Sequence, residues 1–451
     1  MLAASWQDDY DTTRAARHGS DHGGAVLLPS AQALGRPRTA PEHVILIDWD
    51  GFGADFLERA PMPNLQALIA RGSLTLTDST YNTYSNSARA SMSTGAYPEV
   101  HGNAGYYLDR AQNIVVSQNR ILEAQTINQA LAEAGRTTAS VGWYMVQNFG
   151  TTYGDPEHLY VQPGTATKYR GQLGGAWATR VDVAIDILNL RPVDSGGTQV
   201  TVPKVPAFLA VYAGEIDGLI HGTGPATPDL APLLDAYDAH LGRLVQAVSD
   251  AGLAEQTAFM LTADHAMGAW NPSVMPALVE AINATGFRPE VVNVGRSPAS
   301  TTDIVLTSNG VRMSNVYLRN AATGDDGRAA VRRAAERVGH IPNVFDERDL
   351  RRLRASDKLG DMALEAQPPY HFSLLNDGKD RGSHGSTFER AVPLVLAGAG
   401  VRRRRKALDH ASLVDVAPTI AALLGVDPPE QSQGRAMLRA LDSAALQGAG
   451  R

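Results

Sequence analysis

Residues 43–50 have the sequence His43-Val44-Ile45-Leu46-Ile47-Asp48-Trp49-Asp50, and this stretch decides the fold class. A continuous apolar run of this length is typical of a strand that is buried on both faces, as in a parallel sheet. Similar strands are predicted at 205–213, 256–263 and 391–398, and helical patterns alternate with them at 63–70, 124–134, 178–189, 228–251 and 414–424. This alternation predicts an α/β fold with a doubly wound, mostly parallel sheet flanked by helices.

Changes of pattern along the chain predict its domain organisation. Residues 1–40 are polar and aperiodic, which indicates an irregular N-terminal arm, and 441–451 form a tail. From 270 to 370 the pattern turns to short strands and arginine-rich helices, which predicts an inserted α+β cap. We therefore expect one α/β domain that is built from 41–269 and 371–440.

The composition limits the chemistry of the chain. It has 451 residues, no cysteine, and 40 basic against 47 acidic residues, which gives a formal net charge of −7. Without thiols, a metal ion must be held by histidines and carboxylates. The mildly acidic charge predicts no binding of duplex nucleic acid, and no apolar run is long enough for a membrane span. No signal peptide is visible, so we expect a cytoplasmic chain as written and a secreted one if a leader precedes it.

Carboxylates and imidazoles lie close to the ends of the predicted strands. In open parallel sheets, ligands bind outside the carboxyl ends of the strands. This rule selects six residues: Asp50, Asp217, His221, Asp264, His265 and His384. Asp217 and His221 are four apart and share a face of a helical turn. Such a set of oxygen and nitrogen ligands fits a divalent ion, zinc best and manganese or iron as alternatives.

A cluster of hydroxyl groups contains a candidate nucleophile. Residues 83–95 are rich in serine and threonine, and 86–94 are expected to form a helix that ends at Gly95. The free N–H groups at its N-terminus suit a phosphate or sulfate. A serine there, close to a metal ion, can ionise and act as a nucleophile.

These segments resemble the alkaline phosphatase superfamily, and within it the type I phosphodiesterase/nucleotide pyrophosphatase family. The matching pieces occur in the family's order: VILIDWDGF (44–52), PNLQALIARG (63–72), STGAYPEVHG (93–102), DGLIHGTGP (217–225), LTADHAM (261–267), His384-Gly385 and SLVDVAPTIAALLG (412–425). The resemblance implies an alkaline-phosphatase-like catalytic domain with an inserted cap, and a hydrolase of phosphate esters.

The resemblance also implies roles for single residues. It assigns one zinc ion to Asp217, His221 and His384, and a second to Asp50, Asp264, His265 and the nucleophile, which falls on Ser85. Asn103 is the candidate for binding the phosphoryl oxygens. The expected mechanism is attack of Ser85 on phosphorus, a phosphoseryl intermediate, and its hydrolysis between the two metal ions. The expected partner is a small phosphate ester.

The residues that follow Ser85 depart from the family pattern and leave alternatives open. A serine nucleophile is more typical of the phosphomonoesterases of the superfamily. Arg89, four residues later, matches the sulfatase signature and has two alternative roles: contact with a phosphate or sulfate, or an exposed or ion-paired position. Ser87 stands where sulfatases have proline, which favours an unmodified serine at position 85. A sulfatase or phosphonate-type hydrolase and a non-catalytic metal-binding relative remain as alternatives.

Overall fold

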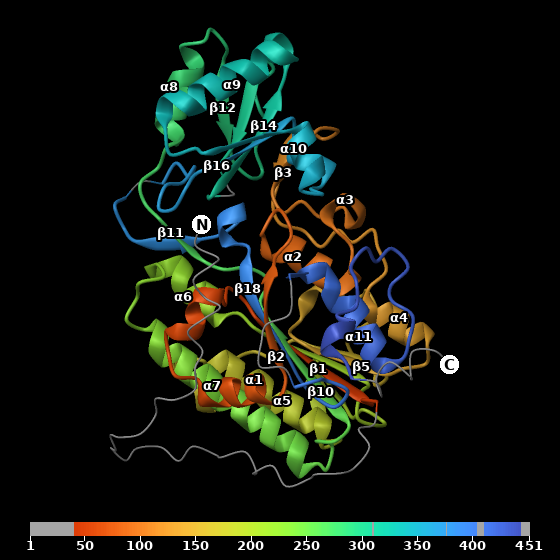
Figure 1. Cartoon of the computed structure of the whole chain (residues 1–451). Coiled ribbons are helices and arrows are strands. Elements are labelled where there is room, and N and C mark those ends of the chain that lie inside the picture. The colour runs from red at the N-terminus through yellow and green to blue at the C-terminus, as the bar shows by residue number, and fades with distance from the viewer. Residues whose placement is uncertain (1–39, 309–310, 376, 404–409, 443–451) are drawn as a thin grey trace. The chain divides into compact units, whose positions relative to one another are not determined.

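The sequence predicted to decide the fold lies inside an eight-stranded sheet. The computed structural model describes residues 40–308, 311–375, 377–403 and 410–442, all within one compact unit. The strand order is β19-β2-β18-β10-β1-β9-β5-β6 (Figure 1). The strands are β1 (His43–Trp49), β2 (Ser73–Asp78), β5 (Thr138–Val141), β6 (His158–Val161), β9 (Phe208–Ala213), β10 (Thr257–Thr262), β18 (Ala391–Gly398) and β19 (Ala411–Ser412).

The sheet is mostly parallel, as predicted, but strand β18 runs the other way. Strand β1 is parallel to both of its neighbours, β9 and β10, and its residues from Val44 onward are buried. Strand β18 is antiparallel to both β10 and β2. The residues before β18 therefore lie at the edge of the sheet where β1, β2, β9 and β10 end.

Helices cover both faces of this sheet, which confirms the doubly wound arrangement (Figure 1). Helices α1, α5 and α7 pack together, and α2, α4 and α11 form a second group. The bounds are α1 (Pro63–Arg71), α2 (Ser85–Thr94), α3 (Pro98–His101), α4 (Ile127–Glu133), α5 (Gly175–Leu188), α6 (Glu215–Thr223), α7 (Leu230–Asp250) and α11 (Val416–Leu424). The expected helices and strands therefore exist, with ends shifted by a few residues.

A second sheet of five strands is built from the segment predicted as the cap. Its order is β12-β13-β14-β16-β15, and all its neighbours except β12 and β13 are antiparallel. The elements of this segment are α8 (Met275–Asn283), β12 (Pro289–Val292), β13 (Ile304–Thr307), β14 (Met313–Leu318), α9 (Asp325–Val338), β15 (Asn343–Asp346), α10 (Glu347–Arg352) and β16 (Met362–Glu365). Helices α8 and α9 share an apolar core with the sheet.

A two-stranded ribbon closes the base of this inserted segment. Strand β11 (Gly268–Trp270) pairs antiparallel with β17 (Arg381–Ser383). The pairing holds the residues just after His265 beside those just before His384. The insertion therefore leaves the two histidines close together although they are far apart in sequence. Hairpins β3–β4 (Tyr107–Asp109, Ile114–Val116) and β7–β8 (Val193–Ser195, Thr198–Val200) complete the sheets.

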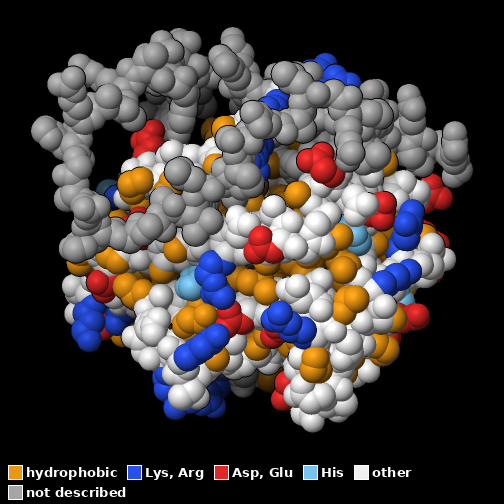
Figure 2. All heavy atoms as spheres, turned by 90° about the horizontal axis from the view of Figure 1, so that it is seen from below, with side chains coloured by type: hydrophobic (Ala, Val, Ile, Leu, Met, Phe, Trp, Pro, Cys, Tyr) orange, Lys and Arg blue, Asp and Glu red, His pale blue; other side chains and the backbone are white. Residues whose placement is uncertain are grey.

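The predicted domain bounds remain predictions, because the described residues form a single unit. The predicted arm, apart from residue 40, and the predicted tail after 442 lie outside the described residues. No helix in the described ranges combines the length and apolar character needed to cross a bilayer. Figure 2 shows basic and acidic side chains interspersed among apolar and uncharged ones on the face that it presents.

A buried histidine connects α2 to α3. His101 Nδ1 accepts a hydrogen bond from the backbone N–H of Asn103 at 3.1 Å, so the proton of the neutral ring lies on Nε2. Nε2 is 2.8 Å from Ser91 Oγ, which therefore accepts its hydrogen. Because the imidazole is the donor, this pair cannot activate the serine. It is a structural link that fixes the turn after α2.

We predict that this histidine makes the fold sensitive to acid. Burial lowers the pKa of His101 to about 3, against 6.5 for an ordinary histidine. The unfolded chain therefore binds one more proton below pH 6.5, so stability is complete above that pH and is lost as the pH falls toward 3. Between about pH 7 and about pH 4.5, the free energy of unfolding should fall about 2–3 kcal/mol further in the wild type than in His101→Gln.

Urea unfolding at a series of pH values measures this difference. His340→Gln, which changes an exposed histidine, is the control and should follow the wild type. Identical pH slopes for the wild type and His101→Gln would contradict the prediction.

Candidate active site

The six predicted ligands meet at one edge of the eight-stranded sheet: Asp50, Asp217, His221, Asp264, His265 and His384. Those from β1, β9 and β10 follow the ends of parallel strands. His384 reaches the same edge from the opposite direction because it precedes the antiparallel strand β18. Five of the six thus follow the carboxyl ends of strands, and the sixth, His384, lies at the same edge because β18 is reversed.

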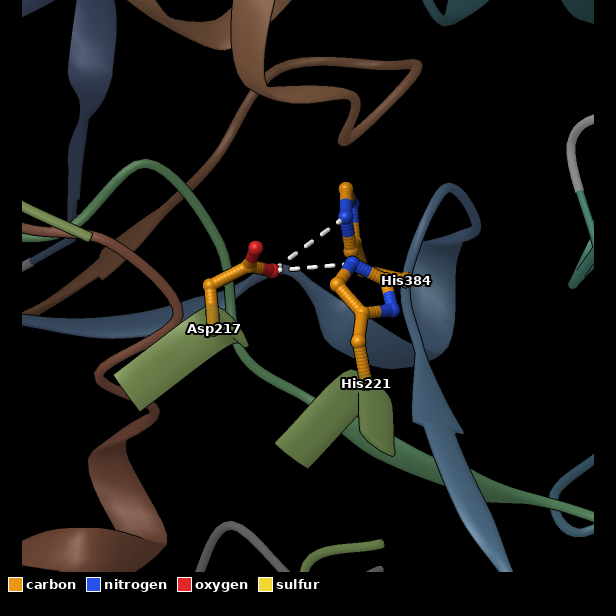
Figure 3. Close-up of side chains that lie close together, drawn as sticks. All are labelled: Asp217, His221 and His384. Atoms are coloured by element: carbon orange, nitrogen blue, oxygen red, sulfur yellow. Dashed lines mark ion pairs between the residues drawn. The ribbon is translucent and has the colours of Figure 1, made fainter. Parts of the chain in front are cut away.

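The first group consists of Asp217 and His221 on α6 and His384 after β17. Figure 3 shows the three side chains pointing toward one another. Asp217 Oδ1 lies 3.1 Å from His221 Nε2 and 3.6 Å from His384 Nε2. One ligand atom from each residue lies within 4.8 Å of the others, so the group has the spacing of a metal site.

The second group is centred on His265. Its Nε2 lies 3.3 Å from Asp50 Oδ1 and 3.1 Å from Asp264 Oδ2. The atoms that meet the same 4.8 Å spacing belong to Asp50, Asp217 and His265. Asp217 therefore belongs to both groups and lies between them, whereas the resemblance assigned it to one ion only.

Gly51 allows this close approach of strand and helix. It has φ +76°, and a Cβ built on it would lie 3.2 Å from the Cα and Cβ atoms of Asp217. Its N–H donates to Asp264 Oδ1 at 3.2 Å, and the N–H of Asp217 donates to the carbonyl of Asp50 at the same distance. The backbone after β1 thus holds carboxylates from three segments in one place.

All three imidazoles present Nε2 to the centre, because Nδ1 is engaged elsewhere. The Nδ1 atoms donate to backbone carbonyls: His221 to Gly382 at 2.9 Å, His265 to Ala266 at 3.2 Å, and His384 to Thr83 at 2.7 Å. These hydrogen bonds fix the tautomer that a metal ligand requires.

Several oxygens of the centre lack hydrogen-bond donors. Among the described residues, Asp50 Oδ1, Asp217 Oδ1 and Asp264 Oδ2 are buried and accept no hydrogen bond. Three carboxylate oxygens and three Nε2 atoms therefore face each other without hydrogen bonds of good geometry, although Asp264 Oδ2 lies 3.1 Å from Arg89 Nη2. This donor set fits divalent ions, and nitrogen and oxygen ligands of this kind suit zinc.

The protonation states reflect the crowding of charge. Burial raises the pKa of Asp50 well above its usual value, against the attraction of Arg89. Burial alone would lower the pKa of His265, but the carboxylates of Asp264 and Asp50 raise it to about 9. Without a metal ion, the His265 imidazolium thus supplies part of the positive charge that the carboxylates require.

Ser85 is the first residue of α2, and its hydroxyl faces the centre. Its Oγ lies 3.1 Å from His265 Nε2, and the residue is half-buried. The alternative hydroxyls are buried and engaged elsewhere: Thr83 Oγ1 donates to the carbonyl of Ser386 and Ser87 Oγ to that of Asn103, both at 3.1 Å. Of these three hydroxyls, the geometry favours Ser85 as the nucleophile.

The loop that follows β4 lies against the N-terminus of α2. The N–H of Asn86 donates to Gln118 Oε1 at 3.2 Å, in the place where the helix end offers a donor to an anion. The side-chain amide of Asn103 donates hydrogen bonds to the carbonyls of Asn119 and Ile121, at 2.9 and 3.1 Å. Asn103 therefore supports this loop, and its direct contact with phosphoryl oxygens stays a prediction.

Two roles were predicted for Arg89, and the structure shows the second of them, an ion-paired position. It is fully buried and pairs with three carboxylates, those of Asp48, Asp50 and Asp264. Its remaining terminal nitrogen, Nη1, donates to the Tyr144 hydroxyl at 2.9 Å. The guanidinium is therefore engaged by the protein and does not face a substrate.

Sequence reasoning missed two residues that touch the centre, Asp48 and Tyr212. Asp48 is buried within β1, and the Tyr212 hydroxyl at the end of β9 donates to Asp50 Oδ2 at 2.7 Å. A signal for Asp48 existed, because residues two apart in a strand point to the same face. No sequence pattern marks Tyr212, whose role depends on the pairing of β9 with β1.

Comparison with known proteins shows the family of the chain. The model of the type I phosphodiesterase/nucleotide pyrophosphatase family matches residues 44–387. The chain belongs to this family. Its members are hydrolases that act on phosphoester bonds, and membership confirms the resemblance drawn from the motifs.

Curated relatives match over part of their length. Venom phosphodiesterase 2 of Crotalus adamanteus is 26% identical over 235 residues, which cover 50% of this chain and 26% of the venom protein. Bis(5'-adenosyl)-triphosphatase enpp4 of Xenopus laevis is 26% identical over 234 residues, which cover 50% of this chain and 47% of that protein. The match thus spans about half or less of these relatives.

Solved structures share the fold of this family member. Murine ectonucleotide pyrophosphatase/phosphodiesterase 5 has a TM-score of 0.64 at 17% identity, covering 86% of this chain and 96% of the murine one. An inactive variant of the murine protein, in complex with AMP, gives the same TM-score at 16% identity and the same coverage. This likeness confirms the alkaline-phosphatase-like fold.

The position of Asp217 in both groups leads to a prediction. Asp217→Asn should weaken the binding of both divalent ions by at least about a hundredfold, because the amide lacks the negative charge that each site shares. Metal content after dialysis, measured by plasma mass spectrometry, tests this. Asp238→Asn is the matched control, since Asp238 is a buried acid that caps α1 by accepting from the N–H groups of Asn64 and Leu65. A full complement of metal in Asp217→Asn would rule out the shared ligand.

Proposed function

We propose that the protein is a metal-dependent phosphodiesterase of the nucleotide pyrophosphatase type, in which Ser85 forms a phosphoseryl intermediate. The observation that carries the proposal is the contact of Ser85 Oγ with His265 Nε2 at 3.1 Å, at the N-terminus of α2 and beside the convergent carboxylates. A half-buried hydroxyl in this position can meet a substrate that enters from solvent.

The ligand sets proposed for two divalent ions, most simply zinc, are Asp217, His221 and His384 for one, and Asp50, Asp264, His265 and Ser85 for the other. When bound, such ions supply positive charge that lowers the pKa of a nearby hydroxyl and offsets charge on a leaving oxygen. Asp217 contributes to both groups through its central position.

In the proposed reaction, Ser85 is the nucleophile and backbone N–H groups bind the phosphoryl oxygens. Ser85 Oγ attacks phosphorus, and the bond from phosphorus to the leaving oxygen breaks as the serine ester forms. Water then cleaves that ester and restores the hydroxyl. The N–H groups at the start of α2 bind non-bridging oxygens, whose charge grows in the transition state. For the N–H of Asn86, this requires the oxygen of Gln118 to move aside.

The relatives suggest which phosphate esters the chain cleaves. Their names describe phosphodiesterases and a dinucleoside triphosphatase, and a structural neighbour binds AMP. We therefore propose nucleotide-containing diesters or pyrophosphates as substrates. The side chain of His221 is 41% exposed. The leaving group of such a substrate can therefore lie beside His221.

Ser85→Ala tests the nucleophile. We expect turnover to fall by at least about a thousandfold, because the attacking oxygen is lost, while zinc content stays near that of the wild type. Ser87→Ala is the matched control: it removes a serine of the same helix whose hydroxyl donates to the carbonyl of Asn103, and it should retain turnover. If Ser85→Ala kept most of its activity, the nucleophile would be Thr83 or Ser87.

A panel of model esters tests the substrate class. We expect kcat/KM for bis(nitrophenyl) phosphate to exceed that for nitrophenyl phosphate by at least about tenfold, a difference of about 1.4 kcal/mol in transition-state binding. Nitrophenyl sulfate should react slowest. Preference for the monoester would favour the phosphomonoesterase alternative, and no turnover together with no bound zinc would favour the non-catalytic one.

Mass spectrometry separates the sulfatase alternative from the proposal. Formylglycine made from serine has two hydrogens fewer, and the tryptic peptide that contains Ser85 would show this loss. We expect the unmodified mass, because Ser87 stands where sulfatases have proline.

A further inference from the structure

We propose that Arg89 is a resident cation of the active site, a positioning residue that holds the carboxylates of Asp50 and Asp264 in place from behind. The inference rests on the proposed function only for the naming of these two residues as metal ligands. Its physical basis is a cluster of buried charges that the roles proposed for the nucleophile and for the metal ligands do not explain.

The guanidinium lies among three carboxylates at short distances. Nε is 2.6 Å from Asp48 Oδ2, and Nη2 is 2.8 Å from Asp50 Oδ2 and 3.1 Å from Asp264 Oδ2. Arg89 and Asp264 are fully buried, and so is Asp48. Removal of one partner from a buried cluster of charges leaves the others without compensation, which is strongly destabilising.

Aromatic side chains complete the site around Arg89. Its Cζ lies 4.5 Å from the ring centroid of Tyr212 and 5.3 Å from that of Tyr144. The Tyr144 hydroxyl accepts from Nη1, and the indole N–H of Trp143 donates to Asp48 Oδ2 at 3.1 Å. The aromatic faces attract the cation and exclude water, which strengthens its attraction for the carboxylates.

The charge of Asp48 shows why a cation is needed here. Asp48 belongs to neither group of described side chains that has the spacing of a metal site. Its only described partners are Arg89 and the Trp143 indole. Without Arg89, this carboxylate would be buried without a counter-charge beside two further carboxylates.

Arg89 also connects the nucleophile to the ligands. It lies four residues after Ser85, on the same face of α2. Asp48 and Asp50 are two apart at the end of β1 and point to one face of the sheet. One side chain thus fixes the register of the nucleophile helix against the strand that carries the ligands.

A variant without this charge should require an external cation. In Arg89→Met, the three carboxylates repel each other and leave space that a small cation can fill. Its thermal unfolding midpoint in EDTA should fall, and magnesium ions should raise that midpoint by at least about 3 °C more than in the wild type. The variant should also bind one more magnesium ion per chain. Guanidinium ion at low millimolar concentration should raise the midpoint of Arg89→Met and leave that of the wild type unchanged.

Two further variants separate this role from mere packing. Arg312→Met is the matched control, because Arg312 is equally buried but its guanidinium pairs with one carboxylate, that of Glu389 at 3.0 Å. It should lose stability without gaining a dependence on cations. Asp48→Asn combined with Arg89→Met should recover stability in EDTA, because the unpaired charge is gone.

The proposal is overturned if Arg89→Met responds to magnesium like the wild type, or if Asp48→Asn brings no recovery. If Arg89→Met is recovered only unfolded, a folded double variant supports the proposal, and a double variant that stays unfolded with magnesium overturns it. All of these readouts are independent of turnover. An inactive wild type would therefore count against the proposed function and leave the role of Arg89 standing.

Discussion

Buried negative charge at one edge of a sheet is the constraint on which the rest of this structure depends. Four carboxylates, those of Asp48, Asp50, Asp217 and Asp264, lie within reach of each other and are largely shielded from water. Such an arrangement is stable only if cations accompany it. The chain supplies one as Arg89, and a protonated His265 supplies another in the absence of metal. The remaining oxygens without donors indicate where divalent ions belong.

The topology explains how ligands from distant segments reach this edge. The parallel strands β1, β9 and β10 all end there, and the antiparallel strand β18 begins there. A segment of more than one hundred residues separates His265 from His384, yet the pairing of β11 with β17 closes its base. The two imidazole rings stack with their centroids 3.4 Å apart. The ribbon thus keeps the two histidines together across the inserted segment.

Much of this arrangement could be predicted from the sequence. Val44–Trp49 is a run of apolar residues broken only by Asp48, and this favours a central parallel strand whatever its neighbours. Asp50, Asp217 and Asp264 follow such strands closely, so a rule about strand ends was sufficient to select them. Arg89 was a different case. Its position four residues after Ser85 fitted a contact with substrate and a buried ion pair equally well, because one helix cannot show what lies opposite it.

The sequence by itself determined the fold class, the residues proposed to carry the chemistry and, through the absence of cysteine, that any metal ligands are imidazoles and carboxylates. These follow from local periodicity and from the chemical nature of single side chains. The tertiary structure alone decided the direction of β18, the sharing of Asp217 by both groups and the burial of Arg89 among Asp48, Asp50 and Asp264. These features depend on pairings between residues far apart in the chain, and local sequence does not contain the distances that create them.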